Sequence, residues 1–182
     1  MTRVYAFLID GFEPSEAIVP IDFMRRAKFE VVVVSLMGRK TVNGSQGITV
    51  EADTLFEDVD SLPLPTSFSC LVDNTRNYLK YDKLKRGGCD PLHTGAWLPF
   101  ARHLWCLAIM EYWKEKGNIY PGFESELEGI TLFISLLWYL DSLLQGAGAG
   151  AAIYFGFKLV EVLADHRVAE LIRQSVNYQQ EV

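Results

Sequence analysis

The sequence predicts an α/β protein with a mainly parallel central sheet. Two short runs, Val4 to Ile9 and Glu30 to Leu36, are almost continuously apolar, and the second contains four successive valines. Such runs are typical of strands that are buried on both faces, which occur mainly in parallel sheets. The residues between the two runs follow helical spacing. Residues 4–36 therefore predict a β-α-β unit, whose crossover is almost always right-handed.

The helix of this unit is expected to begin close to Pro14, after a loop at Asp10 to Phe12. Proline suits the first turn of a helix, because an N–H group there has no partner within the helix. The apolar residues at helical spacing are Ala17, Ile18, Ile21 and Met24. Pro20 lies inside the segment and removes a backbone hydrogen bond, so we expect either a kink or a junction between two short helices.

Turn signals and a second helical pattern follow. Asn43-Gly44 and Gln46-Gly47 predict turns around a short hairpin that ends near Ile48 to Val50. Near the C-terminus, apolar residues form a helical face in residues 157–163 and again in residues 168–172, with a break at Ala164-Asp165. Two helices, or one bent helix, are expected to close the domain.

The central third of the chain follows neither pattern. From residue 62 to residue 116 the apolar residues keep no sustained period, and four prolines interrupt the segment. Residues 130–144 are nearly all apolar, but they are too few for a membrane-spanning helix, which needs about 20 residues. We expect one domain over residues 1–182 with no membrane segment, in which residues 62–118 and 131–145 match the fold poorly.

The composition excludes several classes of function. The formal net charge of -6 provides no electrostatic basis for binding nucleic acid or an anionic membrane. Cys70, Cys89 and Cys106 form no CxxC pair and the three histidines are scattered, so we expect no metal site, and no cofactor is indicated. The N-terminus lacks the features of a signal peptide, and unpatterned cysteines suit a reducing compartment. A cytoplasmic location is expected.

Several blocks of the sequence resemble the DJ-1/ThiJ/PfpI family. The opening, VYAFLIDGFEPSEAIVPIDFMRRA at residues 4–27, resembles the family closely. The resemblance continues through VVVSL at 32–36, VNGSQGITV at 42–50 and ADTLFEDV at 52–59. It resumes with IYPGFESELEG at 119–129, and then with GAGAG at 146–150 and FKLVEVLA at 157–164. These blocks cover a little over half of the chain, in the order of the family and at about its spacing.

The resemblance implies a flavodoxin-like three-layer sandwich that usually dimerises. It also implies a reactive cysteine at a strand-to-helix elbow, with a glutamate from the first helix beside it. Glu16 falls on the position of that glutamate, which gives it the role of partner to the thiolate. A carboxyl group at a helix start, beyond the carboxyl end of a parallel strand, also lies where open α/β sheets bind ligands. Without the resemblance, an exposed glutamate favoured by the helix dipole remains an alternative.

Two further residues are expected to bind substrate. Gly11 lies in the loop after the first strand, and Tyr120 falls on a position that often faces the pocket of the family. By itself, Tyr120 reads as a buried aromatic residue. Members of the family are described as acting on glyoxal-type carbonyls or glycated adducts, and some as chaperones or peptidases.

The cysteine elbow is absent from its expected place. In the family one strand ends in Leu-Pro-Gly-Gly and a later elbow reads Ala-Ile-Cys-Ala, whereas the corresponding segments here read SFSCLVD at 67–73 and WLPFARHLWCL at 97–107. Both segments, and residues 136–145, become compatible with the family when each codon is re-read from the third base of the codon before it. Under this frame-shift hypothesis the cysteine is lost near Phe100 and Ala101. Cys106 has apolar neighbours and is interpreted as a buried, inert thiol.

The sequence therefore predicts a DJ-1/ThiJ/PfpI-like protein related to cysteine-dependent deglycases or glyoxalases, which act on small carbonyl compounds or glycated adducts. The chain as written is expected to be inactive, because this chemistry needs a thiolate at a fixed elbow. The alternative is a non-catalytic, chaperone-like or stress-response protein of the same fold. A homodimer is expected in both cases. A membrane-associated protein, through residues 130–157, is the third possibility.

Overall fold

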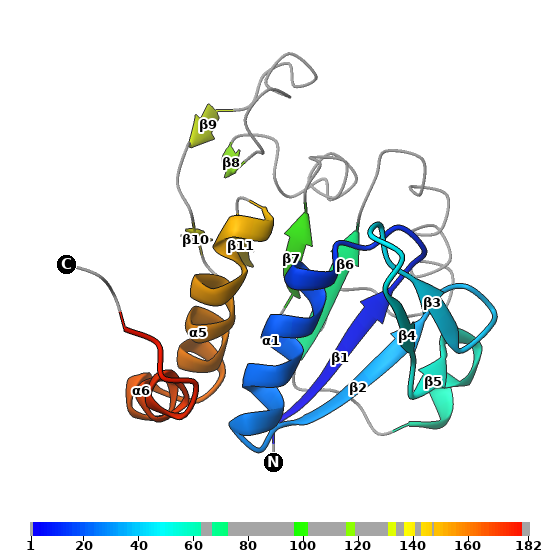
Figure 1. Cartoon of the computed structure of the whole chain (residues 1–182), viewed down its shortest axis with the longest axis horizontal. Coiled ribbons are helices and arrows are strands. Elements are labelled where there is room, and N and C mark those ends of the chain that lie inside the picture. The colour runs from blue at the N-terminus through cyan, green and yellow to red at the C-terminus, as the bar shows by residue number, and fades with distance from the viewer. Residues whose placement is uncertain are drawn as a thin grey trace.

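A five-stranded parallel sheet forms the centre of the computed structural model (Figure 1). The structure describes residues 2–62, 67–72, 97–101, 116–118, 131–133, 137–140, 143–146 and 148–179. The strand order is β5-β2-β1-β6-β7, and all neighbouring pairs are parallel. The strands are β1 (Arg3–Leu8), β2 (Glu30–Ser35), β5 (Thr54–Leu55), β6 (Ser67–Val72) and β7 (Trp97–Ala101). The predicted α/β fold is confirmed, and β6 and β7 lie in the segment whose pattern predicted no element.

The register of the sheet places the ends of its strands at one edge. Val34, Phe7, Cys70 and Pro99 occupy one row across β2, β1, β6 and β7. β1 ends one residue beyond this row, and both β6 and β7 end two residues beyond it. Because all these strands run in the same direction, their carboxyl ends meet at the same edge, where open α/β sheets bind ligands.

Among the described residues, three small two-stranded sheets accompany the central one. β3 (Thr41–Asn43) and β4 (Thr49–Glu51) form the predicted antiparallel hairpin. β8 (Lys116–Asn118) pairs with β9 (Thr131–Phe133) in parallel, and β10 (Leu137–Leu140) pairs with β11 (Leu143–Gly146) in antiparallel fashion. The apolar stretch at residues 130–144 therefore contributes short strands. Within the described ranges, no helix is long and apolar enough to cross a membrane.

Helix α1 (Pro14–Arg26) joins β1 to β2. Its ends complement the helix dipole, with Glu16 in the first turn and Arg25 and Arg26 in the last. The helix continues through Pro20, so the expected alternative of two short helices is wrong. Pro20 is buried, and α1 packs along α5 (Ala152–Leu163). We attribute the continuity of α1 to this packing, which compensates for the hydrogen bond that proline cannot donate.

Both faces of β1 are buried. Every second residue from Val4 to Leu8 belongs to the apolar cluster that also contains residues of α1 and α5. Tyr5 and Phe7 alternate with these residues and so face the opposite side of the sheet, where they are buried as well. There the ring of Phe7 meets that of Phe56, in the 3-10 helix η1 (Phe56–Ser61), edge to face at 6.2 Å. This is the burial predicted for the first apolar run.

Two C-terminal helices complete the described fold, as one of the two predicted alternatives. A 3-10 turn, η4 (Ala149–Ala151), leads into α5, and α6 (His166–Ser175) follows after the break at Ala164 and Asp165. The Asp165 side chain caps α6 by accepting a hydrogen bond from the Val168 N–H at 2.8 Å. In Figure 1 α1 and α5 lie side by side, and α6 packs against α5.

An aromatic contact joins α5 to α1. The rings of Phe157 and Phe23 stack with centroids 4.6 Å apart. Gly156 lies against the same ring, and a Cβ atom at this glycine would be only 2.7 Å from Phe23 Cδ2. The missing side chain of Gly156 therefore allows the two helices to approach closely.

Side chains cover part of the outer edge of β2. β5 pairs with the last two residues of β2, and Asp53 comes directly before β5. Asp53 donates its backbone N–H to the Val33 carbonyl (2.9 Å) and accepts the Val33 N–H through Oδ2 (2.7 Å). Arg25 Nη2 donates to Asp53 Oδ2 at 3.1 Å and to the Val31 carbonyl at 3.3 Å. In the described structure these two side chains take the place of a neighbouring strand along this part of β2.

Candidate functional site

The candidate site begins where β1 ends. Residues 9–13 connect β1 to α1 at the carboxyl edge of the sheet. Gly11, which was expected to bind substrate, has a φ of +87°, in the left-handed region that favours glycine. Its N–H donates to the Asn43 carbonyl at 2.7 Å. A side chain at this position would be strained. No described atom lies within 4 Å of the point where its Cβ atom would be, so the backbone of the loop is open there.

Glu16 lies in the first turn of α1, next to this loop, and its residue is only 3% exposed. Within the part of the chain that the structure describes, the buried polar or charged residues are Glu16 and Ser35. The alternative of an exposed, dipole-favoured glutamate is therefore wrong. Burial of a carboxyl group disfavours its charged form, because the ion loses its hydration.

The hairpin β3–β4 packs against the loop through backbone hydrogen bonds. Phe12 and Gly44 form a parallel bridge, and the Ser45 N–H donates to the Phe12 carbonyl at 2.9 Å. Gly44 is closely surrounded, since a Cβ atom there would lie 2.9 Å from the Ile48 carbonyl oxygen and 3.0 Å from Pro14 Cγ. The turn of the hairpin thus contacts both the loop and the start of α1.

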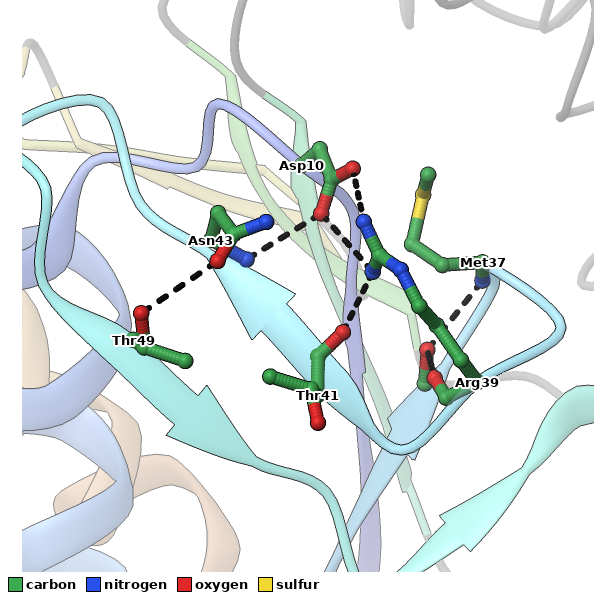
Figure 2. A network of polar contacts seen from close by, with 7 residues as sticks. Asp10, Met37, Arg39, Thr41, Asn43 and Thr49 are labelled. Atoms are coloured by element: carbon green, nitrogen blue, oxygen red, sulfur yellow. Dashed lines mark hydrogen bonds and ion pairs between the residues drawn. The ribbon is translucent and has the colours of Figure 1, made fainter.

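A polar network, shown in Figure 2, links the same loop to the segment after β2. Both carboxylate oxygens of Asp10 accept hydrogen bonds from Arg39, Oδ1 from Nη1 at 3.2 Å and Oδ2 from Nη2 at 2.5 Å. Oδ1 also accepts the Asn43 N–H at 3.1 Å. Arg39 Nη1 donates in addition to the Thr41 carbonyl. A planar guanidinium that binds a carboxylate through two nitrogens fixes direction as well as distance.

The buried Ser35 side chain stabilises the turn that carries Arg39. The Ser35 hydroxyl, fully buried at the end of β2, donates to the Arg39 carbonyl at 2.5 Å and accepts the Met37 N–H at 3.1 Å. A second tie lies at the start of α1, where Glu13 Oε2 accepts from the Ser45 hydroxyl at 3.0 Å. Polar contacts therefore hold the loop on both sides of Gly11.

Glu16 and Gly11 lie at the edge where the sequence predicted them, whereas the pairing of Asp10 with Arg39 was not predicted. The two residues are 29 positions apart, and no local spacing rule connects them. Only the fold reveals the pair. The other expected substrate-binding residue, Tyr120, lies outside the described residues, as does Cys106.

The position where the cysteine was expected falls at the same edge of the sheet. Ala101 is the last residue of β7, and Phe100 precedes it. β6 separates β7 from β1, so two inter-strand spacings, roughly 10 Å in all, separate β1 from β7. Cys70 lies inside β6 rather than at its end. In the described ranges, no three His, Cys, Asp or Glu residues group as a metal site.

The strand order and the parallel register define an α/β protein of the flavodoxin-like class. Its loop at residues 9–13 lies at the carboxyl edge of the sheet, where such proteins bind ligands. Residues 2–72 match the model of the DJ-1/PfpI family. The resemblance predicted from the sequence to the DJ-1/PfpI family is therefore confirmed, and residues 2–72 are the part that carries it. The matches interpreted at residues 119–129 and 146–164 lie outside this range and stay interpretations.

Solved structures of the same class support the fold over nearly the whole chain. A cysteine-to-alanine mutant of a DJ-1 superfamily protein from Salmonella typhimurium has a TM-score of 0.82 at 18% identity, covering 99% of this chain and 100% of its own. Drosophila melanogaster DJ-1beta has a TM-score of 0.82 at 19% identity, covering 98% of this chain and 99% of its own. Oxidized Toxoplasma gondii DJ-1 has a TM-score of 0.77 at 21% identity, covering 99% of this chain and 100% of its own. The flavodoxin-like fold is confirmed.

Proposed function

We propose that this protein carries the pocket of a cysteine-dependent hydrolase that acts on reactive carbonyls or glycated adducts, and that the chain lacks the nucleophile of this reaction. The observation that carries the proposal is the burial of Glu16, 3% exposed, in the first turn of α1 beside the Gly11 loop. A glutamate side chain is rarely buried this completely, so the position is unusual. The DJ-1/PfpI match over residues 2–72 includes both residues.

Glu16 supplies one half of the chemistry. A thiolate is the nucleophile in cysteine-dependent addition to a carbonyl group. A buried carboxyl group, kept neutral by the cost of its ionisation, donates a hydrogen bond to a neighbouring thiolate and stabilises the negative charge. Gly11, with its open backbone, and Tyr120 are the proposed substrate contacts.

The other half of the chemistry is missing from the written chain. Phe100 and Ala101 occupy the end of β7, where the proposal requires the cysteine. Neither residue offers a nucleophile, so the chain is proposed to bind carbonyl compounds without converting them. The protein is further proposed to act in the cytoplasm, because its unpatterned cysteines suit a reducing compartment.

Cysteines installed at the end of β7 test the proposal. Phe100→Cys and Ala101→Cys are made separately, each with and without Glu16→Gln. Alkylation of the new thiol is followed against pH by peptide-resolved mass spectrometry, because Cys70, Cys89 and Cys106 also react. Methylglyoxal consumption is measured in parallel.

We expect one of the two cysteines to have a pKa below about 7.5, against about 8.5 for a free thiol, and to consume methylglyoxal. Glu16→Gln in that background should raise the thiol pKa and reduce turnover at least about tenfold, while the unmodified chain shows no turnover. If both new thiols titrate like free cysteine and ignore Glu16→Gln, the proposed reaction is wrong.

Peptide mapping of the natural protein tests the frame-shift hypothesis separately. The hypothesis predicts a peptide containing Ala-Ile-Cys-Ala from the region of residues 87–118. Recovery of Leu98 to Arg102 as written would reject it. The protein is then a non-catalytic relative.

A non-catalytic, chaperone-like or stress-response homodimer is the second candidate. Exposed isoleucines favour it: Ile18 on α1 and Ile153 on α5 are each 39% exposed, on helices that pack together. Ile18→Asp should convert a dimer to a monomer in sedimentation velocity, because it places a charge on an apolar contact surface. Leu171→Asp, on α6, is the control and should leave the dimer intact. A native chain that sediments as a monomer would exclude the dimer.

A further inference from the structure

We propose that Arg39 is a positioning residue, whose ion pair with Asp10 fixes the Gly11 loop and thereby sets the placement of Glu16. The inference deepens the proposed function and rests on it, since the placement of Glu16 matters only if this edge is the site. Arg39 has no place in the chemistry itself. It acts through the loop that it holds.

The geometry of the pair favours a directional role. Arg39 contacts both Asp10 oxygens, at 3.2 and 2.5 Å, and also donates to the Thr41 carbonyl. One guanidinium therefore joins Asp10, in the loop after β1, to Thr41, the first residue of β3. Its side chain is 44% exposed and that of Asp10 is 33% exposed. Ion pairs with this exposure contribute little to the stability of a whole chain, so the consequence of this pair is local.

Each residue of the loop from 10 to 12 is tied to the hairpin. Asp10 accepts the Asn43 N–H at 3.1 Å, and the Asn43 carbonyl accepts the Gly11 N–H at 2.7 Å. The Asn43 side chain is held in turn by the Thr49 hydroxyl at 3.2 Å. Figure 2 shows Asp10 and Asn43 facing one another between Arg39 and Thr49. Asn43 thus contacts two successive residues of the loop.

The loop needs such ties, because glycine at its centre leaves the backbone free to adopt other conformations. The hairpin is a separate two-stranded sheet that does not extend the central one. An isolated two-stranded hairpin is marginally stable, and this one is fixed by Val42, which is buried in the core, and by its polar contacts with the loop. The Asp10–Arg39 pair on one side and the Glu13–Ser45 contact on the other connect the hairpin to the chain around Gly11.

The loop then leads directly into α1. Glu16 follows Gly11 by five residues, and Pro14, which starts the helix, contacts Gly44 of the hairpin. A displacement of the loop therefore displaces the first turn of α1, where Glu16 is buried. Precise placement matters in such a site, since a misplacement of about 1 Å can cost a hundredfold in rate.

Arg39→Ala tests the inference in the chain as written, without any installed cysteine. The readouts are hydrogen exchange at the Gly11 amide and the chemical shift of the ¹³C-labelled Glu16 carboxyl group. Arg26→Ala is the matched control: Arg26 is also 44% exposed and also pairs with an aspartate, but it lies at the far end of α1. Arg39→Lys keeps the positive charge but loses the planar group that contacts both Asp10 oxygens through two nitrogens.

We expect Arg39→Ala to accelerate exchange at Gly11 at least about tenfold and to move the Glu16 signal, with little change in the thermal midpoint. Arg39→Lys should give an intermediate effect, and it replaces Arg39→Ala if that variant fails to fold. Arg26→Ala should leave both signals in place. If Gly11 exchange stays within about twofold in both Arg39 variants and the Glu16 signal does not move, the inference is overturned. The two proposals can fail separately. If the Glu16 signal moves in the Arg39 variants but Glu16→Gln has no effect on the pKa of an installed thiol, the positioning role is supported and the proposed reaction is rejected.

Discussion

Gly44→Ala is the substitution whose effect the structure predicts most directly. The added Cβ atom would lie 2.9 Å from the Ile48 carbonyl oxygen, 3.0 Å from Pro14 Cγ and 3.3 Å from the Phe12 carbonyl oxygen. Two of these atoms belong to the backbone and cannot rotate away. The hairpin must therefore move away from the loop, or the loop must move away from the hairpin.

The magnitude follows from two opposing effects. Overpacking of a filled contact typically costs about 1–3 kcal/mol of folding free energy. Alanine also restricts the unfolded chain, which offsets about 0.4–1 kcal/mol of that cost. We expect a net destabilisation of about 1–2 kcal/mol. For a chain of this size, each kcal/mol lowers the melting temperature by about 2–4 °C, so the expected fall is about 2–8 °C.

Urea unfolding followed by circular dichroism measures this effect, with Gly150→Ala as the matched control. A Cβ atom at Gly150 meets no atom of the described residues within 4 Å, so that variant should stay within about 0.5 kcal/mol of the unmodified chain. Exchange at the Ser45 amide, which donates to the Phe12 carbonyl, should accelerate in Gly44→Ala alone. Equal stability of the two alanine variants would refute the close contact between hairpin and loop.

Four further substitutions examine three other contacts. Gly156→Ala should destabilise by about 1 kcal/mol in urea unfolding, because the clash with Phe23 outweighs the gain in helix propensity. Adding Phe23→Leu should give a total below the sum of the single effects, and strict additivity would contradict the clash. Asp165→Ala removes the cap of α6 and should cost about 1 kcal/mol in the same assay; an unchanged midpoint would count against the cap. A side-chain hydrogen bond with Tyr154 raises the pKa of Tyr178 above 10.0. Since the folded pKa exceeds the unfolded one, this stabilisation is complete below about pH 10 and is lost as the pH rises through the folded pKa. Tyr178→Phe should therefore reduce the alkaline loss of stability, and an identical alkaline profile would refute the assignment.

The elements with a strong local pattern were predictable from the sequence. The first apolar run became β1 because its residues are buried on both sides, and α1 begins at Pro14 as expected. The effect of Pro20 was harder to predict, because packing along α5 decides whether the helix continues. That contact joins residues far apart in the sequence.

β7 could not be predicted, for a physical reason. It contains Pro99, and proline cannot donate a hydrogen bond within a sheet, which argues against a central strand. Among the described residues β7 is the last strand of the five-stranded sheet, where proline is tolerated. Local sequence does not report the position of a strand within its sheet.

In the candidate site, too, one feature was predictable from local sequence and others depended on the fold. The position of Glu16 in the first turn of α1 was predictable, because a carboxyl group at a helix start beyond a parallel strand is a local signal, whereas its role stays a prediction. Its burial depends on how α1 packs, which the spacing of residues alone does not determine. The Asp10–Arg39 pair depends on the path of the chain after β2 and on the hairpin, so it required the fold.

The side chains along β2 have a consequence for how the protein meets other chains. An open strand edge offers unpaired N–H and C=O groups to any extended peptide, and this is a common origin of aggregation. Along β2 the Asp53 carboxylate occupies the Val33 N–H, and Arg25 occupies the Val31 carbonyl. An incoming strand would have to break these bonds and separate the Arg25–Asp53 ion pair before it could form its own ladder. This side of the sheet is thereby protected against strand addition, and a partner chain meets charged side chains there instead of free backbone.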